Sequence, residues 1–282
     1  GLNPLDVSEV VLRALHEDCD GDGDVTSVAT ISAEQMSTLD FVARAPGVIA
    51  GMPVAAAVFA ILGGSSIRMS SVIRDGESVQ AGTVLGSIVG STRVLLQGER
   101  PALNLLSHLS AIATATRAWA DALSDSTTKV RDTRKTTPGM RILEKYAVRC
   151  GGGLNHRMNL SDAALIKDNH VVAAGGVARA YELIKQRYPN LPVEVEVDSM
   201  DQLAEALEVG ADLVLLDNFT IEELKSAVDF TGGRAKLEAS GGFTFDQAKE
   251  VASTGVDFVA VGAITHSAPV LDIGADLRME SI

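Results

Sequence analysis

Short apolar runs alternate with longer amphipathic stretches from about residue 124 onward. Six runs rich in β-branched residues predict strands, at residues 129–132, 164–168, 193–197, 213–217, 235–240 and 258–262. The segments between most of these runs are long enough for a helix, and strands that alternate with helices are typical of βαβ units. The second half of the chain is therefore predicted to be an α/β fold with a parallel sheet.

Three helix starts in this half carry a common signal. Residues 199–202, 220–223 and 244–247 each fit a capping box, in which the first and fourth side chains satisfy each other's backbone N–H groups. Each box follows closely after a predicted strand. No G-x-G-x-x-G opens a helix after the first strand, which disfavours a dinucleotide-binding sheet. The rhythm of strand, short loop and capped helix favours an α/β barrel.

The first 110 residues are less regular. Their pattern predicts a helix at 5–17, an apolar helix at about 52–62 and a long helix from about 97 to 123. Residues 45–67 carry no charge, but glycines and a proline confine the helix to a length too short for a membrane span, so a buried core helix is expected. Residues 74–88 resemble the hammerhead of biotinyl and lipoyl domains, without the lysine that carries the cofactor. We expect a small α/β domain here.

Composition and charge narrow the function classes. The net charge is −13 and the pI is near 4.8, and such an acidic surface disfavours binding to nucleic acids or anionic membranes. The chain has two cysteines, too few for a disulfide framework, and its N-terminal segment lacks the apolar core of a signal peptide. The predicted location is the cytoplasm.

One segment of this acidic chain is strongly basic. Residues 129–157 hold eight of the 24 lysines and arginines but only two acids. Clustered cations repel one another unless anions compensate, so the cluster predicts a pocket for a small, multiply charged anion. The residues assigned to that pocket are Arg134, Lys135, His156 and Arg157, together with Lys167 from the next predicted strand. Lys129, Arg131, Lys145 and Arg149 are assigned to a solvated surface.

The ends of the predicted strands carry the remaining candidate chemistry, because catalytic groups in barrels lie at the C-terminal ends of strands. Glu196 and Asp217 end the middle strands and could hold Mg²⁺ or stabilise a developing cation; alternatively, they are ion partners for nearby lysines. Gly241 and Gly242 follow a late strand, where backbone N–H groups could bind phosphate; alternatively, they only form a turn.

Several motifs occur in an order and spacing that is highly specific. They are GDVTS (23–27), RDTRKTTPGMR (131–141), GGGLNHR (151–157), KDNH (167–170), VEVEVD (193–198) and EASGG (238–242). With these motifs the chain resembles the quinolinate phosphoribosyltransferase family over essentially its whole length. The resemblance implies an open seven-stranded α/β barrel at 110–267, with one strand still to be placed near 151–160. It also implies a smaller, hammerhead-like N-terminal α/β domain at 1–109, to which the tail 268–282 returns.

The resemblance implies a glycosyltransferase of NAD biosynthesis. The phosphoribosyl group of phosphoribosyl pyrophosphate would pass to quinolinate with decarboxylation, giving nicotinate mononucleotide, diphosphate and CO₂, with Mg²⁺ as cofactor. The family also implies a homodimer, or an assembly of such dimers. Three alternatives stay open: a related phosphoribosyltransferase acting on another pyridine or ring carboxylate, a Schiff-base aldolase using Lys167 or Lys135, and a biotinyl-like carrier.

The resemblance also implies roles for single residues. Quinolinate would be bound by Thr133, Arg134, His156, Arg157, Lys167 and the neighbouring subunit's copy of Arg100. Phosphoribosyl pyrophosphate would be bound by Lys135, Glu196, Asp217, Ser240, Gly241, Gly242, Gly262, Ala263, Ile264 and His266. Glu196, Asp217, Lys135 and Lys167 would be catalytic, and Glu196 and Asp217 would hold Mg²⁺ directly or through water.

Overall fold

The computed structural model describes residues 1–19 and 23–279. The chain forms two compact units: unit 1 comprises Gly1–Arg117, Thr137–Gly152 and Ser267–Ile282, and unit 2 comprises Ala118–Thr136 and Gly153–His266. Residues 280–282 of the predicted tail lie outside the described part. The structure groups Thr137–Gly152 with unit 1, whereas the sequence-based division assigned this segment to the barrel.

Unit 1 is built around an antiparallel sheet in the order β12-β1-β5-β3. Its strands are β1 (Met36–Ala43), β3 (Arg68–Ser71), β5 (Val84–Ser91) and β12 (Ile273–Met279), and β2 (Gly47–Val48) pairs with β4 (Ser78–Val79) beside it. Strand β12 pairs with β1 over its whole length, from Ser37↔Met279 to Ala43↔Ile273. This pairing joins the C-terminal segment of the chain to the N-terminal sheet.

The helices of unit 1 follow the apolar pattern of the sequence. They are α1 (Pro4–Asp18), α2 (Val25–Thr30), α3 (Met52–Gly63), the turn η1 (Gly64–Ser66), α4 (Thr92–Ala122, whose last residues belong to unit 2) and α5 (Arg141–Cys150). Helix α3 buries Val54, Val58 and Phe59 completely, which confirms the predicted core helix. Helix α4 begins at Thr92 rather than Gln97, because it follows β5 without a loop. No helix in the described residues has the length and apolarity to cross a membrane.

Asp24, from the GDVTS motif, caps α2. Its Oδ1 accepts hydrogen bonds from the backbone N–H groups of Thr26 and Ser27, at 3.1 Å each, and the Ser27 hydroxyl also donates to the carboxylate. The Ser27 hydroxyl bond, with the backbone bonds, lowers the pKa of Asp24 below its usual 3.8. The ionised form of the Asp24 carboxylate is therefore more stable in the folded protein than in the unfolded chain.

Replacing Asp24 with alanine is expected to lower the free energy of unfolding by about 1 kcal/mol at pH 7. Because the folded pKa is depressed, this contribution is complete above the unfolded pKa and disappears as pH falls through the folded pKa. Urea unfolding of both proteins at pH 7 and at decreasing pH measures the difference. A difference that stays constant into the acid range would contradict the cap.

Unit 2 contains a parallel sheet in the order β6-β11-β10-β9-β8-β7. The strands are β6 (Lys129–Arg131), β7 (Ala164–Ile166), β8 (Val193–Val197), β9 (Leu213–Asp217), β10 (Lys236–Ser240) and β11 (Phe258–Ala260). All six predicted strands are confirmed. An isolated parallel bridge between Arg131 and Leu154 adds a seventh position beside β6, inside the range where the missing strand was expected. The predicted barrel-like α/β architecture is confirmed.

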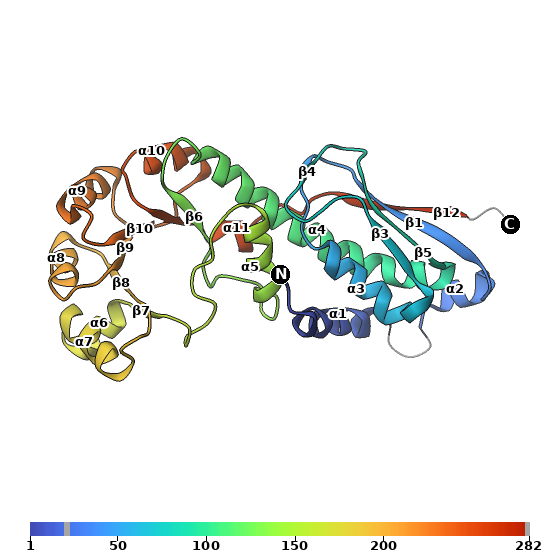
Figure 1. Cartoon of the computed structure of the whole chain (residues 1–282), viewed down its shortest axis with the longest axis horizontal. Helices are drawn as coiled ribbons and strands as arrows, with labels where there is room; N and C mark the ends of the chain where they lie inside the picture. Colours follow the sequence, from blue (N-terminus) through green and yellow to red (C-terminus); the bar gives the residue numbers. More distant parts are fainter. Residues whose placement is uncertain (20–22, 280–282) are drawn as a thin grey trace. The chain divides into compact units, whose positions relative to one another are not determined.

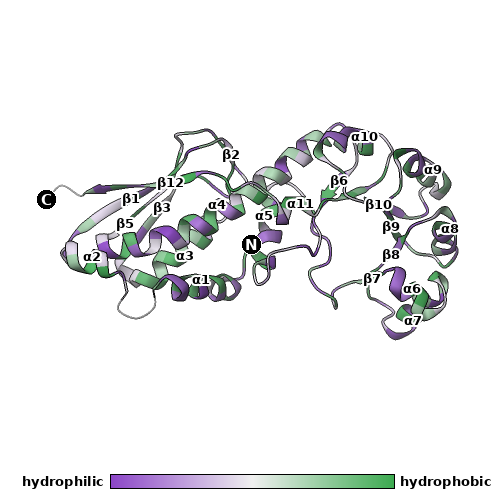
Figure 2. Cartoon of the chain, turned by 180° about the vertical axis from the view of Figure 1, so that it is seen from behind, coloured by the Kyte–Doolittle hydropathy of each residue, from purple (hydrophilic) through white to green (hydrophobic). Residues whose placement is uncertain are grey.

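Helices cover the outer side of this sheet (Figure 1). The helices of unit 2 are α6 (Asp168–Ala174), α7 (Val177–Arg187), α8 (Met200–Glu208), α9 (Ile221–Thr231), the turn η2 (Phe245–Gln247), α10 (Ala248–Ala252) and α11 (Ala263–His266). Helix α8 buries Leu203 and Ala206, and α9 buries Leu224 and Ala227, while both carry polar residues elsewhere (Figure 2). This amphipathicity holds the helices against the strands and leaves the strand ends accessible.

Two of the three predicted capping boxes are present. The boxes at 220–223 and 244–247 form, although the second begins a 3₁₀ turn rather than an α-helix. The box predicted at 199–202 is wrong, because the Gln202 side chain accepts instead from the backbone N–H of Asp198, at 3.1 Å.

Candidate active site

Side chains alternate between the two faces of a strand, and in β8 this alternation places two carboxylates on one face. Glu194 and Glu196 share that face, and the buried Val193, Val195 and Val197 lie on the other. At the C-terminal ends of the strands the inward groups enclose a cavity of about 360 Å³. Its lining residues are Thr133, Arg134, Lys135, His156, Arg157, Leu165, Lys167, Glu196, Leu215, Asp217, Ser240 and Ala260. The structure thus brings most of the predicted polar site residues together in one cavity.

Two arginines on this cavity lack partners for a buried donor. The Nε atoms of Arg134 and Arg157 are buried, and neither has a hydrogen-bond partner within the described part of the chain. Burial and the nearby charge of Arg134 lower the pKa of the Arg157 guanidinium. Unsatisfied charged donors that repel each other are costly, so an anion with at least two negative groups would stabilise both.

Lys167 and Glu196 form an ion pair on the wall of the same cavity. In the register of β7 and β8, Ile166 lies opposite Val195, so the next residue of each strand is brought level with the other. The Nζ of Lys167 lies 2.9 Å from Oε2 of Glu196. Glu196 is therefore an ion partner of a lysine, as the alternative interpretation expected, and it also lines the cavity.

The carboxylate of Asp217, at the end of β9, is hydrogen-bonded to the next residue in the chain. The Asp217 carboxylate accepts a hydrogen bond of 2.8 Å from the side-chain amide of Asn218, whose φ is +59°. Asp217 ends β9 and, like Glu196, faces the cavity. The cavity thus combines cations from the segments that follow β6 and β7, and from residues 153–157, with carboxylates from β8 and β9.

The glycines after β10 pack against the preceding loop. Gly241 has φ of +132°, and a Cβ at this position would lie 2.9 Å from Cα of Asn218. Only glycine fits here, so the turn interpretation has a structural basis of its own. Ser240 lines the cavity, whereas the other residues predicted for the phosphate site do not: Gly241, Gly242, Gly262, Ala263, Ile264 and His266.

The segment around Gly262 lies beside Lys135. The Thr265 hydroxyl donates to the backbone carbonyl of Lys135 at 2.8 Å, and a Cβ on Gly262 would lie 3.1 Å from Cδ of Lys135. The side chain of Ile264 is in the core, so only its backbone could serve a ligand. The phosphate-binding role of this group stays a prediction.

Arg100 does not line the cavity. It lies exposed on α4 in unit 1, beside a separate hollow that Ser107 and Leu271 also line. Its predicted role in a neighbouring subunit stays a prediction.

His156 faces the barrel interior with both ring nitrogens engaged. Its Nε2 lies 2.7 Å from Oε2 of Glu194, and its Nδ1 accepts a hydrogen bond of 2.7 Å from the backbone N–H of Arg157. The side chain is 7% exposed. The ring borders the cavity but directs its hydrogen bonds into the protein.

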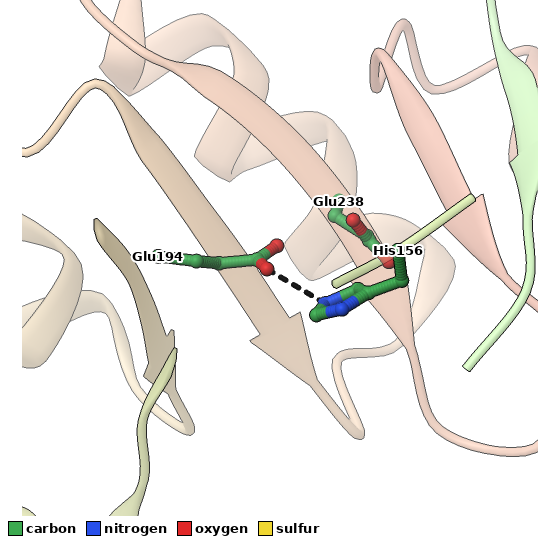
Figure 3. Close-up of side chains that lie close together, drawn as sticks. All are labelled: His156, Glu194 and Glu238. Carbon is green, nitrogen blue, oxygen red and sulfur yellow. Dashed lines mark ion pairs between the residues drawn. The ribbon is translucent and has the colours of Figure 1, made fainter. Parts of the chain in front are cut away.

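A buried charge cluster that was not predicted from the sequence lies next to the cavity, with which it shares His156. It consists of Arg131, His156, Glu194 and Glu238, and Figure 3 shows the last three side chains converging. Arg131 was predicted to be solvated, which is wrong: its side chain is 13% exposed and pairs with both glutamates. Lys145, assigned to the same surface, is fully buried in α5. The i, i+2 spacing of Glu194 and Glu196 in β8 is a signal that could have placed Glu194 on the same face as Glu196.

The pKa values of the two buried glutamates shift in opposite directions. Burial and the charge of Glu194 raise the pKa of Glu238 well above its usual value. Burial also works against ionisation of Glu194, but the hydrogen bond and the charge of His156, together with the charge of Arg131, outweigh it and lower the pKa of Glu194.

The cluster has the side chains of a metal site but the charge of an ion pair. His156, Glu194 and Glu238 place ligand atoms within 4.8 Å of one another, as a metal would require. The guanidinium of Arg131 contacts both glutamates and already supplies the positive charge. A divalent cation would have to displace it, so we assign no metal to the cluster.

Comparison with known proteins follows the same two-part division. Residues 112–276 match the model of the quinolinate phosphoribosyl transferase C-terminal domain, and residues 24–110 match that of its N-terminal domain. The chain is 47% identical over 273 residues to a nicotinate-nucleotide pyrophosphorylase (carboxylating) of Mycobacterium leprae, covering 95% of this chain and 96% of the relative. It is 37% identical over 294 residues to a decarboxylating quinolinate phosphoribosyltransferase of Nicotiana tabacum, covering 98% and 83%.

Solved structures agree with these matches. The nicotinate-nucleotide pyrophosphorylase of Francisella tularensis superposes with a TM-score of 0.94 at 38% identity, covering 99% of this chain and 98% of that one. The enzyme of the same name from Ehrlichia chaffeensis gives a TM-score of 0.92 at 36% identity, covering 96% and 98%.

Proposed function

The chain belongs to the quinolinate phosphoribosyltransferase family, and from this premise we propose that it transfers phosphoribosyl from phosphoribosyl pyrophosphate to quinolinate. The products are nicotinate mononucleotide, diphosphate and CO₂, in the biosynthesis of NAD. The observation that supports this most directly is the pair of buried, unpartnered Nε donors of Arg134 and Arg157 in one cavity. A ring with two adjacent carboxylates supplies the negative charges that these donors need.

In the proposed reaction the pyridine nitrogen attacks C1 of the ribose as the C1–O bond to diphosphate breaks. Arg134, Arg157 and Lys167 bind the quinolinate carboxylates and orient the ring nitrogen. Glu196 and Asp217 stabilise the positive charge that develops at C1, and Lys135 faces the departing diphosphate. Orientation and electrostatic stabilisation are the main contributions of such a site, which needs no nucleophilic side chain.

Decarboxylation follows from the charge that this step creates. The ring nitrogen of the bound mononucleotide is positive, so it stabilises the electron pair left at the adjacent carbon when CO₂ departs. That carbon then takes up one proton. The same cations that held the substrate keep the ring in place during this step.

Mg²⁺ is the proposed cofactor. Glu196 and Asp217 offer two carboxylates on one cavity, and these would hold Mg²⁺ together with substrate oxygens and water. When bound, the ion would neutralise part of the diphosphate charge. The predicted cytoplasmic location fits the two free cysteines of the chain, Cys19 and Cys150.

Turnover of quinolinate tests the function. With Mg²⁺ and phosphoribosyl pyrophosphate, quinolinate labelled in its 2-carboxylate is expected to yield labelled CO₂ and an equal amount of nicotinate mononucleotide. Nicotinate, with one carboxylate, is expected to yield neither. Product from nicotinate, or from another ring acid in preference to quinolinate, would favour the alternative of a related phosphoribosyltransferase.

The proposed homodimer shares its active sites through Arg100. Mixing Arg100→Ala subunits with Lys167→Ala subunits, each inactive alone, is expected to restore about a quarter of the wild-type activity. About half of randomly formed dimers would be mixed, and each mixed dimer would have one intact site of two. Activity is measured after the two variants are unfolded and refolded together. Mixtures that stay inactive while mass spectrometry shows mixed dimers would contradict the shared site.

A further inference from the structure

We propose that Asn218 is a positioning residue of the active site: its side-chain amide holds the carboxylate of Asp217 in the orientation that faces the ribose. Asp217 lines the cavity and Asn218 does not, so Asn218 acts on the reaction through Asp217 and without touching a substrate. This inference rests on the proposed function, in which Asp217 stabilises the positive charge at C1. Its evidence lies in one turn of unit 2, between β9 and α9.

The backbone of Asn218 has a conformation that few side chains tolerate. Its φ is +59°, and among the described residues it is the one non-glycine residue with a positive φ. Most side chains are strained there because Cβ crowds the following carbonyl oxygen, whereas glycine, asparagine and aspartate adopt this left-handed conformation most readily. The turn therefore restricts which residues fit at position 218.

The left-handed backbone brings the side chains of Asp217 and Asn218 together. Successive side chains of an extended strand project to opposite faces, so an extended residue after Asp217 would direct its side chain away from the carboxylate. At Asn218 the chain has left β9, and the side-chain Nδ2 lies 2.8 Å from Oδ2 of Asp217. A carboxylate accepts hydrogen bonds and the amide N–H donates, so the direction of this bond is defined.

The neighbouring strand end holds the turn from one side. The backbone N–H of Asn218 donates to the carbonyl of Ser240 at 3.0 Å, which continues the register in which Asp217 lies opposite Ser240. Gly241 approaches the same residue closely: a Cβ on Gly241 would lie 2.9 Å from Cα and 3.0 Å from Oδ1 of Asn218. The amide of Asn218 is thus held between the end of β10 and Asp217.

The residues after Asn218 hold the turn from the other side. The side chain of Phe219 is 5% exposed, and the Thr220 hydroxyl accepts from the backbone N–H of Glu223 at 3.2 Å, in the capping box of α9. The chain therefore passes from the end of β9 to the cap of α9 within two residues. Because the backbone of Asn218 is fixed on both sides, its amide is kept at one place beside Asp217.

Orientation matters because Asp217 acts on a charge that develops in the transition state. Without the amide bond, the Asp217 side chain would rotate and turn its oxygens toward water, where they stabilise the ribose less. A misplacement of about 1 Å in an active site can lower the rate by about 100-fold. Asn218 is exposed, so we expect its hydrogen bond to contribute little to overall stability and to act mainly on the rate.

Three substitutions separate the amide from the backbone. Asn218→Gly keeps the left-handed turn and removes the donor, Asn218→Asp keeps the shape and replaces the donor by a negative group, and Asn218→Ala loses the donor and strains the backbone. We expect kcat to fall by about tenfold to a hundredfold in Asn218→Gly, and at least as far in Asn218→Asp. Asn218→Ala should also lower the melting temperature, whereas Asn218→Gly should not.

The loss should be confined to the chemical step. KM for quinolinate is expected to change by less than about threefold in Asn218→Gly, because the cations that hold the diacid come from other segments. Asn190→Gly is the matched control, since Asn190 is exposed in the turn before β8, at the opposite end of the strands, and should keep the wild-type kcat. A wild-type kcat in Asn218→Gly would show that the backbone alone matters, and would overturn the proposal. A loss that comes from a higher KM for quinolinate, with kcat unchanged, would do the same.

Nuclear magnetic resonance tests the contact itself and needs no turnover. The side-chain amide protons of Asn218 are assigned by their loss in Asn218→Gly. One of them is expected at lower field in the wild type than in Asp217→Ala, because a proton donated to a carboxylate is deshielded. Identical amide signals in the two proteins would remove the hydrogen bond, and the proposal with it. Absence of wild-type turnover would instead overturn the proposed function, and the amide signals would still report the contact.

Discussion

Replacing Arg134 with alanine is expected to weaken quinolinate binding by about 2–4 kcal/mol, or about 30- to 1,000-fold in dissociation constant. Its buried Nε has no partner in the described protein, so the substrate carboxylate is the group that satisfies it. Removing its charge also relieves the repulsion with Arg157, and the free variant is therefore expected to unfold at a temperature no lower than the wild type. Calorimetric titration and thermal unfolding measure the two effects.

Arg179→Ala is the control for this experiment. Arg179 is exposed on α7 and pairs only with Glu182 in the described structure, so the same loss of a guanidinium should leave quinolinate affinity unchanged. Normal affinity in Arg134→Ala would mean that the cations of the cavity do not hold the diacid. A lower melting temperature without loss of affinity would assign Arg134 to stability alone.

Replacing Glu196 with glutamine is expected to lower kcat by about 100- to 1,000-fold, the range for removing one group that stabilises transition-state charge. The carboxylate faces the cavity and balances Lys167 at 2.9 Å. Without it, the site loses negative charge where the ribose becomes positive, and Lys167 is left unbalanced. Steady-state rates at saturating substrates and Mg²⁺ measure the change.

Asp201→Asn is the matched control, because this exposed carboxylate lies in the first turn of α8, shortly after the same strand. It should leave kcat unchanged. If Glu196→Gln also kept its kcat and only lost stability, the glutamate would be a structural partner of Lys167, the alternative that its hydrogen bond already allows.

The strands of unit 2 and most of the cavity could be predicted because both depend on local sequence. Runs such as VEVEV have the composition and period of a buried strand, and a parallel sheet brings the ends of its strands to one edge. Residues that follow different strands, such as Lys167 and Glu196, therefore meet although 29 residues separate them. Topology alone was sufficient to place them in one site.

The buried cluster could not be predicted in the same way. Arg131 and Glu238 are 107 residues apart, and a charged residue at a strand position reads as solvated until its partner is known. The orientation of His156 depends on its contacts with the Arg157 backbone and with Glu194. Neither contact produces a sequence pattern from which it could be predicted. Pairing of charges inside a barrel is a tertiary property, so it required the structure.

The pairing of β12 with β1 has a consequence for how the chain is made. Ribosomes deliver β1 before the strands of unit 2 and Ile273–Met279 after them, so the sheet of unit 1 stays incomplete while unit 2 is being translated. All six barrel strands emerge before β12. A nascent chain halted before Ile273 would expose the long edge of β1, and unpaired edges of this kind recruit other chains into aggregates.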